Sequence, residues 1–272
     1  MFPFLVLLFL VTVEIIVRLD RRFRPVPILI YHFIDGEGEK RGLSVSLSRF
    51  EQHLMYLLQH NFRLISLEEF VKSKQTRTLL PGRCVVITFD DGDEAFYTKV
   101  YPFLLRYQLP ATVFVVTEWI GRAGYLNWEQ LRSMSRHLVT VGSHTVSHRY
   151  LPDLELDAVR RELVESKRVL EEKLDRLVNF LSYPVGGFNR EIVRLARETG
   201  YLAACTTNRG RNFFQQDLFV LKRVKMTEKT TQSYILTAKF SGYYNLLSQF
   251  FPKQTGARLI STSGKNNTVL PL

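Results

Sequence analysis

Short apolar runs alternate with amphipathic stretches along most of this chain, and that alternation limits the possible folds more than any other feature. Residues 85–89 and 111–116 are runs rich in β-branched and aromatic side chains, whereas residues 157–177 carry apolar positions at helical spacing among many charges. Strands that alternate with helices predict a parallel sheet with helices outside it. About six to eight such units suit a closed or an incomplete (β/α) barrel.

The same periodicity places the remaining elements and divides the chain into four parts. Further strands are expected at 28–33, 62–66, 138–144, 201–207 and 218–224, and residues 179–186 are expected to form a strand that runs into a turn. Further helices are expected at 48–59 with Ser48 as N-cap, and at 67–73, 95–107, 128–135, 189–200 and 230–240. The sequence therefore predicts a hydrophobic anchor at 1–17, a basic, proline-containing linker at 18–27, one α/β domain at 28–240, and a partly flexible extension at 241–272.

The first segment, MFPFLVLLFLVTVEIIV, is apolar apart from Thr12 and Glu14 and is about long enough to cross a bilayer. It lacks the basic start and the small-residue cleavage site of a secretory signal peptide, so we expect an uncleaved membrane anchor. Four arginines follow within residues 18–24, which favours a cytoplasmic location for that side. Charge alone therefore leaves the topology open.

The composition narrows the classes of partner. The chain has 272 residues, a net charge of +11 and two cysteines, Cys84 and Cys205. Two cysteines exclude a disulfide framework and a cysteine-rich zinc module, and both lie in strand-like runs, where buried thiols are expected. The positive charge suits an anionic partner, but it is spread along the chain without a basic stripe, so nucleic-acid binding is not expected. No feature indicates a protein partner.

Two adjacent carboxylates, Asp90 and Asp91, end the apolar run at 85–89. Like charges this close repel each other, and a bound cation would offset that cost. His144 and His148 follow the strand expected at 138–144, and they share one face if the segment becomes helical there. Since ligand groups gather at the carboxyl ends of parallel strands, two histidines and one carboxylate predict a catalytic zinc site with one position left for water. The other aspartate is then free to act as a base.

Here the sequence resembles a known family. TFDDG at 88–92 and SHTVSH at 143–148 are similar to the first two signatures of the polysaccharide deacetylases, or NodB-homology domains, and SYPVGG at 182–187 resembles the third. Supporting matches are PILIYHF at 27–33, PATVFV at 110–115 and FVLKRV at 219–224. The resemblance covers roughly residues 25–226, and it implies an irregular (β/α) barrel, which agrees with the alternation of strands and helices.

The resemblance also implies an activity, the metal-dependent removal of N-acetyl, or in some members O-acetyl, groups from an acetylated polysaccharide. Carried over by position, Asp91, His144 and His148 would bind the metal, with Zn²⁺ expected, and Asp90 would be the general base. The third motif, with Tyr183, Pro184 and Val185, would supply the oxyanion site, most simply through the N–H of Val185. The family also implies a cell-envelope location, with the domain outside the cytoplasm.

The chain departs from the family pattern in two places. Ser182-Tyr183-Pro184 stands where many members carry an arginine, and Leu221-Lys222-Arg223 replaces a Leu-x-His motif whose histidine is the general acid. Arginine stays protonated and is a poor acid. We expect Arg223 to supply the positive charge missing from the third motif by lying beside Asp90, and His32 to donate a proton to the leaving amine.

These departures resemble the branch that deacetylates poly-N-acetylglucosamine. The sequence thus predicts a hydrolase that removes N-acetyl groups from an N-acetylglucosamine-containing polysaccharide. Two alternatives stay open: an O-acetyl esterase that uses the same site, and a glycan-binding homologue with impaired catalysis. His53, His60 and His137 are expected on the surface or at helix ends rather than in the site.

Overall fold

The computed structural model describes residues 25–36, 42–210, 212, 216–231 and 233–240. The anchor expected at 1–17, most of the linker and the extension expected at 241–272 lie outside these residues, and they stay predictions. Within the described part of the chain, no helix is both long enough and apolar enough to cross a bilayer.

One parallel sheet, with the strand order β10-β1-β5-β6-β7-β8-β9, forms the centre of the protein, and β4 pairs with β5 beside this path. Every pairing in it is parallel, so the alternation of strands and helices was read correctly. The strands are β1 Ile28–Tyr31, β4 Phe62–Leu64, β5 Arg83–Phe89, β6 Ala111–Val115, β7 Val139–Ser143, β8 Phe180–Ser182, β9 Ala203–Cys205 and β10 Val224–Lys225. A separate pair joins β2 Phe33–Ile34 to β3 Ser44–Val45.

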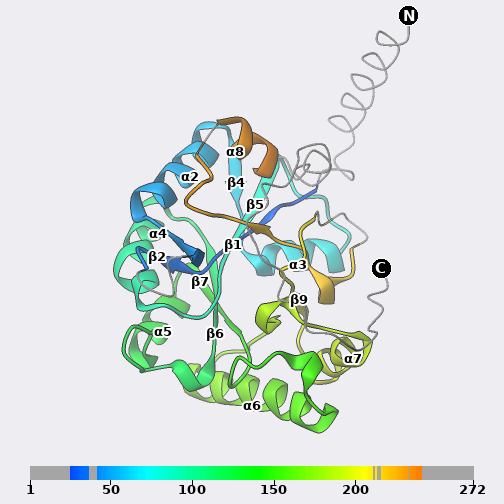
Figure 1. Ribbon diagram of the computed structural model, residues 1–272. Helices are drawn as coiled ribbons and strands as arrows, with labels where there is room; N and C mark the ends of the chain where they lie inside the picture. Colours follow the sequence, from blue (N-terminus) through cyan, green and yellow to red (C-terminus); the bar gives the residue numbers. More distant parts are fainter. Residues whose placement is uncertain (1–24, 37–41, 211, 213–215, 232, 241–272) are drawn as a thin grey trace, which may run out of the picture.

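The sheet curls into a half-barrel with helices around its outside (Figure 1). In Figure 1, α2, α4, α5 and α6 follow one another around the edge of the molecule. The helices are α2 Leu47–Gln59, α3 Leu67–Gln75, α4 Tyr101–Tyr107, α5 Trp128–Ser135, α6 Leu156–Leu174, α7 Arg190–Glu198 and α8 Ser233–Phe240, with a π-helical turn, Phe96–Val100, before α4.

Two local predictions were wrong. The N-cap of α2 is Ser46 rather than Ser48, because the Ser46 hydroxyl accepts the bond from the Arg49 N–H that an N-cap requires. The strand expected at 218–224 is a 3₁₀ turn, Leu218–Val220, followed by the short strand β10. Asp217 caps that turn by accepting a bond from the Phe219 N–H, and this local bond competes with the extended conformation.

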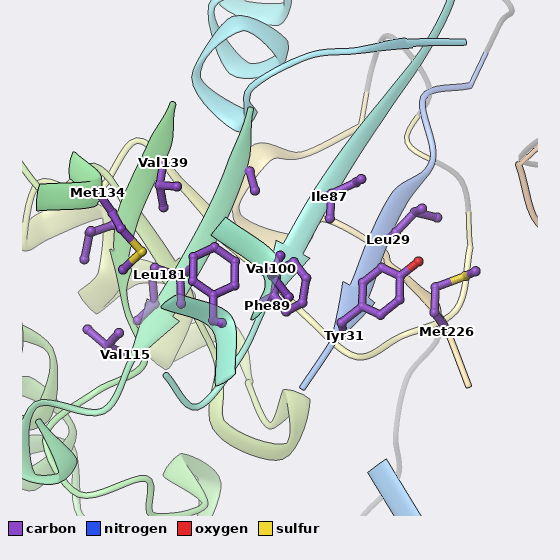
Figure 2. Close-up of a cluster of buried hydrophobic side chains, with 14 of the residues drawn as sticks. Leu29, Tyr31, Ile87, Phe89, Val100, Val115, Met134, Val139, Leu181 and Met226 are labelled. Atoms are coloured by element: carbon purple, nitrogen blue, oxygen red, sulfur yellow. The ribbon is translucent and has the colours of Figure 1, made fainter. Parts of the chain in front are cut away.

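Alternate side chains of each strand face opposite layers of the core. One layer lies between the sheet and the helices, and Figure 2 shows part of it, with Leu29 and Tyr31 from β1 beside Ile87 and Phe89 from β5. The other layer lines the inside of the half-barrel and contains Val86 from β5. The other strand residues of this layer are Ile28, Cys84, Phe114, Phe180, Ala203 and Cys205, and α3 adds Leu67, Phe70 and Val71. Both cysteines are therefore buried, as the sequence predicts.

Candidate active site

The two-residue period of the strands brings the polar residues together at one end of the half-barrel. Cys84 and Val86 face the inner layer, and Asp90 continues the same series just after β5 ends. His144 follows β7, and Ser182 is the last residue of β8. All these strands run in parallel, so their carboxyl ends meet at one edge of the sheet.

Asp91, His144 and His148 form a compact cluster at this edge. One ligand atom from each lies within 4.8 Å of the others. Oδ1 of Asp91 is 3.5 Å from Nε2 of His144 and 3.5 Å from Nε2 of His148. Two imidazole nitrogens and one carboxylate oxygen are a donor set that suits Zn²⁺, so the residues present fit the metal that the sequence predicts.

The segment after β7 does not become helical at the two histidines. A loop carries His144 to His148 instead, and it still brings the two rings together. Thr145 and His148 have positive φ angles of 69° and 58°, so the chain turns sharply twice within this loop. Residues other than glycine adopt this conformation only where the surroundings hold them in it.

Glu162, on α6, holds the loop in this conformation. Its carboxylate accepts hydrogen bonds from the N–H groups of Val146 and Ser147, at 2.8 and 3.0 Å, and from the Ser147 hydroxyl. The N–H of His148 donates to Thr145 Oγ1 at 3.2 Å. A buried or half-buried carboxylate with several donors fixes the backbone that it caps, so Glu162 sets the position from which His148 projects.

Ser182 fixes the orientation of the other histidine. His144 Nδ1 lies 2.7 Å from the Ser182 carbonyl oxygen, which only accepts, so Nδ1 carries the proton and Nε2 faces Asp91 with a free lone pair. Burial lowers the pKa of His144 to about 4, although the charge of Asp90 opposes this shift. The imidazole is therefore neutral at neutral pH, as a metal ligand must be.

Asp90 and Arg223 form a buried, bidentate ion pair. Arg223 Nη1 donates to Asp90 Oδ1 and Nη2 donates to Oδ2, both at 2.7 Å. Arg223 is fully buried and Asp90 is 2% exposed. Burial alone would raise the pKa of Asp90, but the charge of Arg223 outweighs it, so that the pKa lies well below its usual range. Arg223 therefore lies beside Asp90, as the sequence predicts, although it precedes β10 rather than ending a strand.

Three neutral groups complete the surroundings of the ion pair. Ser182 Oγ donates to Asp90 Oδ2 at 3.0 Å and accepts from Arg223 Nη2 at 2.8 Å. Arg223 Nη1 also donates to Thr88 Oγ1, and its Nε donates to the Thr206 carbonyl. Ser182 therefore bonds to both members of the ion pair, and the cation comes from Arg223, directly before β10.

His32, between β1 and β2, lies close enough to Asp90 and His148 for their charges to act on it. Burial lowers the pKa of His32 to about 4, and the charge of Asp90 opposes that shift. Its imidazole is neutral at neutral pH in the metal-free protein. It therefore has to gain a proton during a reaction before it can donate one.

The third motif divides into a buried and an exposed part. Tyr183 is fully buried, its N–H donates to the Cys205 carbonyl and its hydroxyl donates to the Phe219 carbonyl. With both donors engaged, the structure contradicts a direct substrate contact by Tyr183, and Pro184 is buried and has no N–H to offer. Val185 is 66% exposed and has a φ of 57°, a strained conformation for a β-branched residue. Of the three, Val185 alone is placed to meet a substrate.

His53 was wrongly predicted to be a surface residue. It is fully buried on α2, between the Tyr31 hydroxyl at 3.1 Å and the Thr230 carbonyl at 2.8 Å. Glu162 and Ser182 were also missed as supports of the site. Glu162 looks like any charge on the exposed face of a helix, and Ser182 is an ordinary strand residue, so neither carried a local signal.

Comparisons with known proteins agree with this geometry. The family model described as polysaccharide deacetylase matches residues 79–204. A Bacillus subtilis protein named as a polysaccharide deacetylase, YxkH, is 32% identical over 203 residues, which cover 74% of this chain and 71% of that protein. A Staphylococcus aureus poly-beta-1,6-N-acetyl-D-glucosamine N-deacetylase is 27% identical over 183 residues, or 62% of this chain, and the match spans 63% of that enzyme, less than two thirds of its length.

Solved structures share the fold. The deacetylase PplD of Streptococcus pyogenes, in complex with acetate, superposes with a TM-score of 0.72 at 27% identity, over 84% of this chain and 99% of that one. IcaB of Ammonifex degensii superposes with a TM-score of 0.72 at 25% identity, over 80% of this chain and 97% of that one. The chain therefore belongs to the polysaccharide deacetylase family of hydrolases, with the irregular (β/α) barrel of its NodB-homology domain.

Proposed function

We propose that this protein is a metal-dependent enzyme that removes N-acetyl groups from an N-acetylglucosamine-containing polysaccharide. The observation that carries the proposal is the cluster of Asp91, His144 and His148 beside the buried, ionised Asp90. The substrate class is supported by the poly-N-acetylglucosamine deacetylase among the relatives.

Asp91, His144 and His148 would hold the metal, and Zn²⁺ is the ion that their donor atoms suit best. When bound, the ion would act as a Lewis acid on the acetyl oxygen and would lower the pKa of water, so that a nucleophile forms near neutral pH. The protein contributes the orientation of its ligands, through Ser182 for His144 and Glu162 for the loop of His148.

Asp90 would accept the proton of the attacking water. Its carboxylate offers about four lone-pair positions. Arg223 occupies one on each oxygen, and the Ser182 hydroxyl occupies the second one on Oδ2. One position remains on Oδ1, and we assign the base function to that atom. Because the charge of Arg223 holds the pKa of Asp90 well below its usual range, the carboxylate is ionised at neutral pH and can accept a proton.

The leaving amine needs a proton, and His32 is the group that we propose delivers it. His32 is neutral at rest, so the proton taken from the water has to reach it before the carbon–nitrogen bond breaks. The N–H of Val185 would donate to the developing oxyanion, since this residue is exposed and lies in the turn that follows β8.

The test is acetate release from N-acetylglucosamine oligomers, with O-acetylated xylan as a second substrate, before and after removal of metal by a chelator and re-addition of Zn²⁺. We expect release from the amide substrate, loss of it on chelation and recovery with Zn²⁺. Asp91→Asn should abolish activity, whereas Asp153→Asn, an exposed carboxylate in the loop before α6, should not change it. Release only from xylan would identify an esterase, and no release from either substrate would refute the proposed activity.

A further inference from the structure

Two aromatic side chains, Trp119 and Tyr125, lie beside the metal-ligand cluster without belonging to the hydrophobic core. We call this pair the aromatic ledge. Both residues are partly exposed. Among the residues that the structure describes, the other tryptophan, Trp128, packs against the core, whereas neither member of the ledge does so. Burial of apolar surface in the core therefore does not account for these two rings.

The rings contact each other and one of the proposed metal ligands. The ring centroids of Trp119 and Tyr125 are 5.1 Å apart, with 48° between the planes. The centroids of Trp119 and His148 are also 5.1 Å apart, with 36° between the planes. The ledge thus begins at the ring of His148 and extends away from it through Trp119 to Tyr125.

The backbone fixes the ledge to both ligand-bearing loops. On one side, the N–H groups of Thr117 and Glu118 donate to the carbonyls of Thr145 and Val146, at 3.2 and 3.1 Å. On the other side, the N–H of Leu126 donates to the Gly92 carbonyl at 2.9 Å, directly after Asp91. The segment that carries Trp119 and Tyr125 is therefore held at a fixed distance from the reacting groups on either side.

We propose that the aromatic ledge is a binding subsite for the pyranose ring next to the one whose acetamide is hydrolysed. This inference rests on the proposed function and adds a preference for chains over single sugars. A pyranose with equatorial substituents presents a face of C–H groups, and a fixed, partly exposed aromatic surface packs against such a face without having to be ordered on binding. An acetamide carbonyl at the cluster places the neighbouring sugar within reach of Trp119, which contacts His148 directly.

A binding experiment tests the ledge independently of catalysis. The chain has two tryptophans, so Trp128→Phe leaves Trp119 as the only indole fluorophore. In that variant, treated with chelator so that no hydrolysis occurs, we expect a saturable change in emission with β-linked N-acetylglucosamine pentasaccharide and a much weaker response to the monosaccharide. An unchanged emission across the titration would overturn the subsite.

Kinetics of the Zn²⁺-loaded enzyme separate substrate binding from support of His148. Trp119→Ala should raise KM for the pentasaccharide on the order of tenfold, while kcat and the affinity for Zn²⁺ stay near normal. Trp119→Phe should recover part of the loss. Tyr107→Ala, an aromatic control at the end of α4, should leave KM unchanged. If Trp119→Ala instead weakens Zn²⁺ binding with KM unchanged, Trp119 only supports the ligand. A wild-type enzyme that binds the pentasaccharide but releases no acetate would refute the proposed function and not the ledge.

Discussion

Removal of the Arg223 guanidinium should destabilise the protein far more than removal of a surface arginine at the same distance from its partner. Arg223→Met leaves the Asp90 carboxylate buried with the Ser182 hydroxyl as its one remaining donor among the bonds described above. It also takes donors away from Thr88, Ser182 and Thr206. Removing one partner of a buried ion pair costs about 3–5 kcal/mol.

This cost corresponds to a fall in Tm of about 6–20 °C for a domain of this size. The matched control is Arg197→Met. Arg197 pairs with Asp217 at 2.6 Å, but the two side chains are 48% and 45% exposed. Exposed pairs contribute about 0–1 kcal/mol, so the control should change Tm by a few degrees at most. Both variants are measured by thermal and urea unfolding in the presence of chelator, so that metal binding does not add to stability.

A double-mutant cycle assigns the effect to the ion pair. Asp90→Asn removes the charge that Arg223 compensates, so the Asp90→Asn/Arg223→Met variant should be less destabilised than the sum of the two single changes, with a coupling of about 2 kcal/mol or more. If the two effects add, or if Arg223→Met unfolds at the temperature of the control variant, then the pair does not stabilise the fold in the way described here.

Two further perturbations test the supports of the site. Glu162→Ala should weaken Zn²⁺ affinity at least tenfold, because the loop of His148 loses the acceptor of three hydrogen bonds. The control Glu165→Gln, on the exposed side of α6, should leave the Zn²⁺ affinity unchanged. Equal affinities of the two variants in chelator competition would exclude a positioning role for Glu162. Burial lowers the pKa of His53 to about 4, so the folded state favours the neutral ring. The neutral ring contributes to the free energy of unfolding above about pH 6.5, and this contribution is lost as the pH falls toward 4. His53→Gln should flatten this part of the stability–pH curve by up to about 3 kcal/mol, and an unchanged slope between pH 4 and 6.5 in urea unfolding would contradict the assignment.

The parts of the fold that repeat along the chain were readable from the sequence. Unbroken apolar runs separated by amphipathic stretches predicted the parallel sheet, and strand ends predicted that Asp90, Asp91 and His144 would meet. Both inferences depend on periodicity, which is local, and on the common direction of parallel strands, which is general. Neither needs knowledge of a particular tertiary contact.

The parts that depend on distant contacts were not readable. His53 looks like a surface residue because its helix is amphipathic, but its two partners are 22 and 177 residues away in the sequence. For the loop of His148, the four-residue spacing of the histidines suggested only what a helix would do there, and the sequence does not show the loop. Its actual shape is held by Glu162, a carboxylate from the following helix. Tyr183 was assigned to the oxyanion site only through the resemblance of the third motif, and the packing shows that both of its donors are engaged.

The position of β10 next to β1 has a consequence for how this enzyme folds during synthesis. Asp90 and Arg223 are 133 residues apart in the sequence. During synthesis, the first two motifs therefore leave the ribosome long before the arginine that neutralises Asp90. Until β10 docks, any compact form that encloses Asp90 holds an unpaired charge away from water, which is strongly unfavourable. Docking of β10 beside β1 therefore also completes the reactive centre, so a chain released before Arg223 should gain neither a stable fold nor an ionised base.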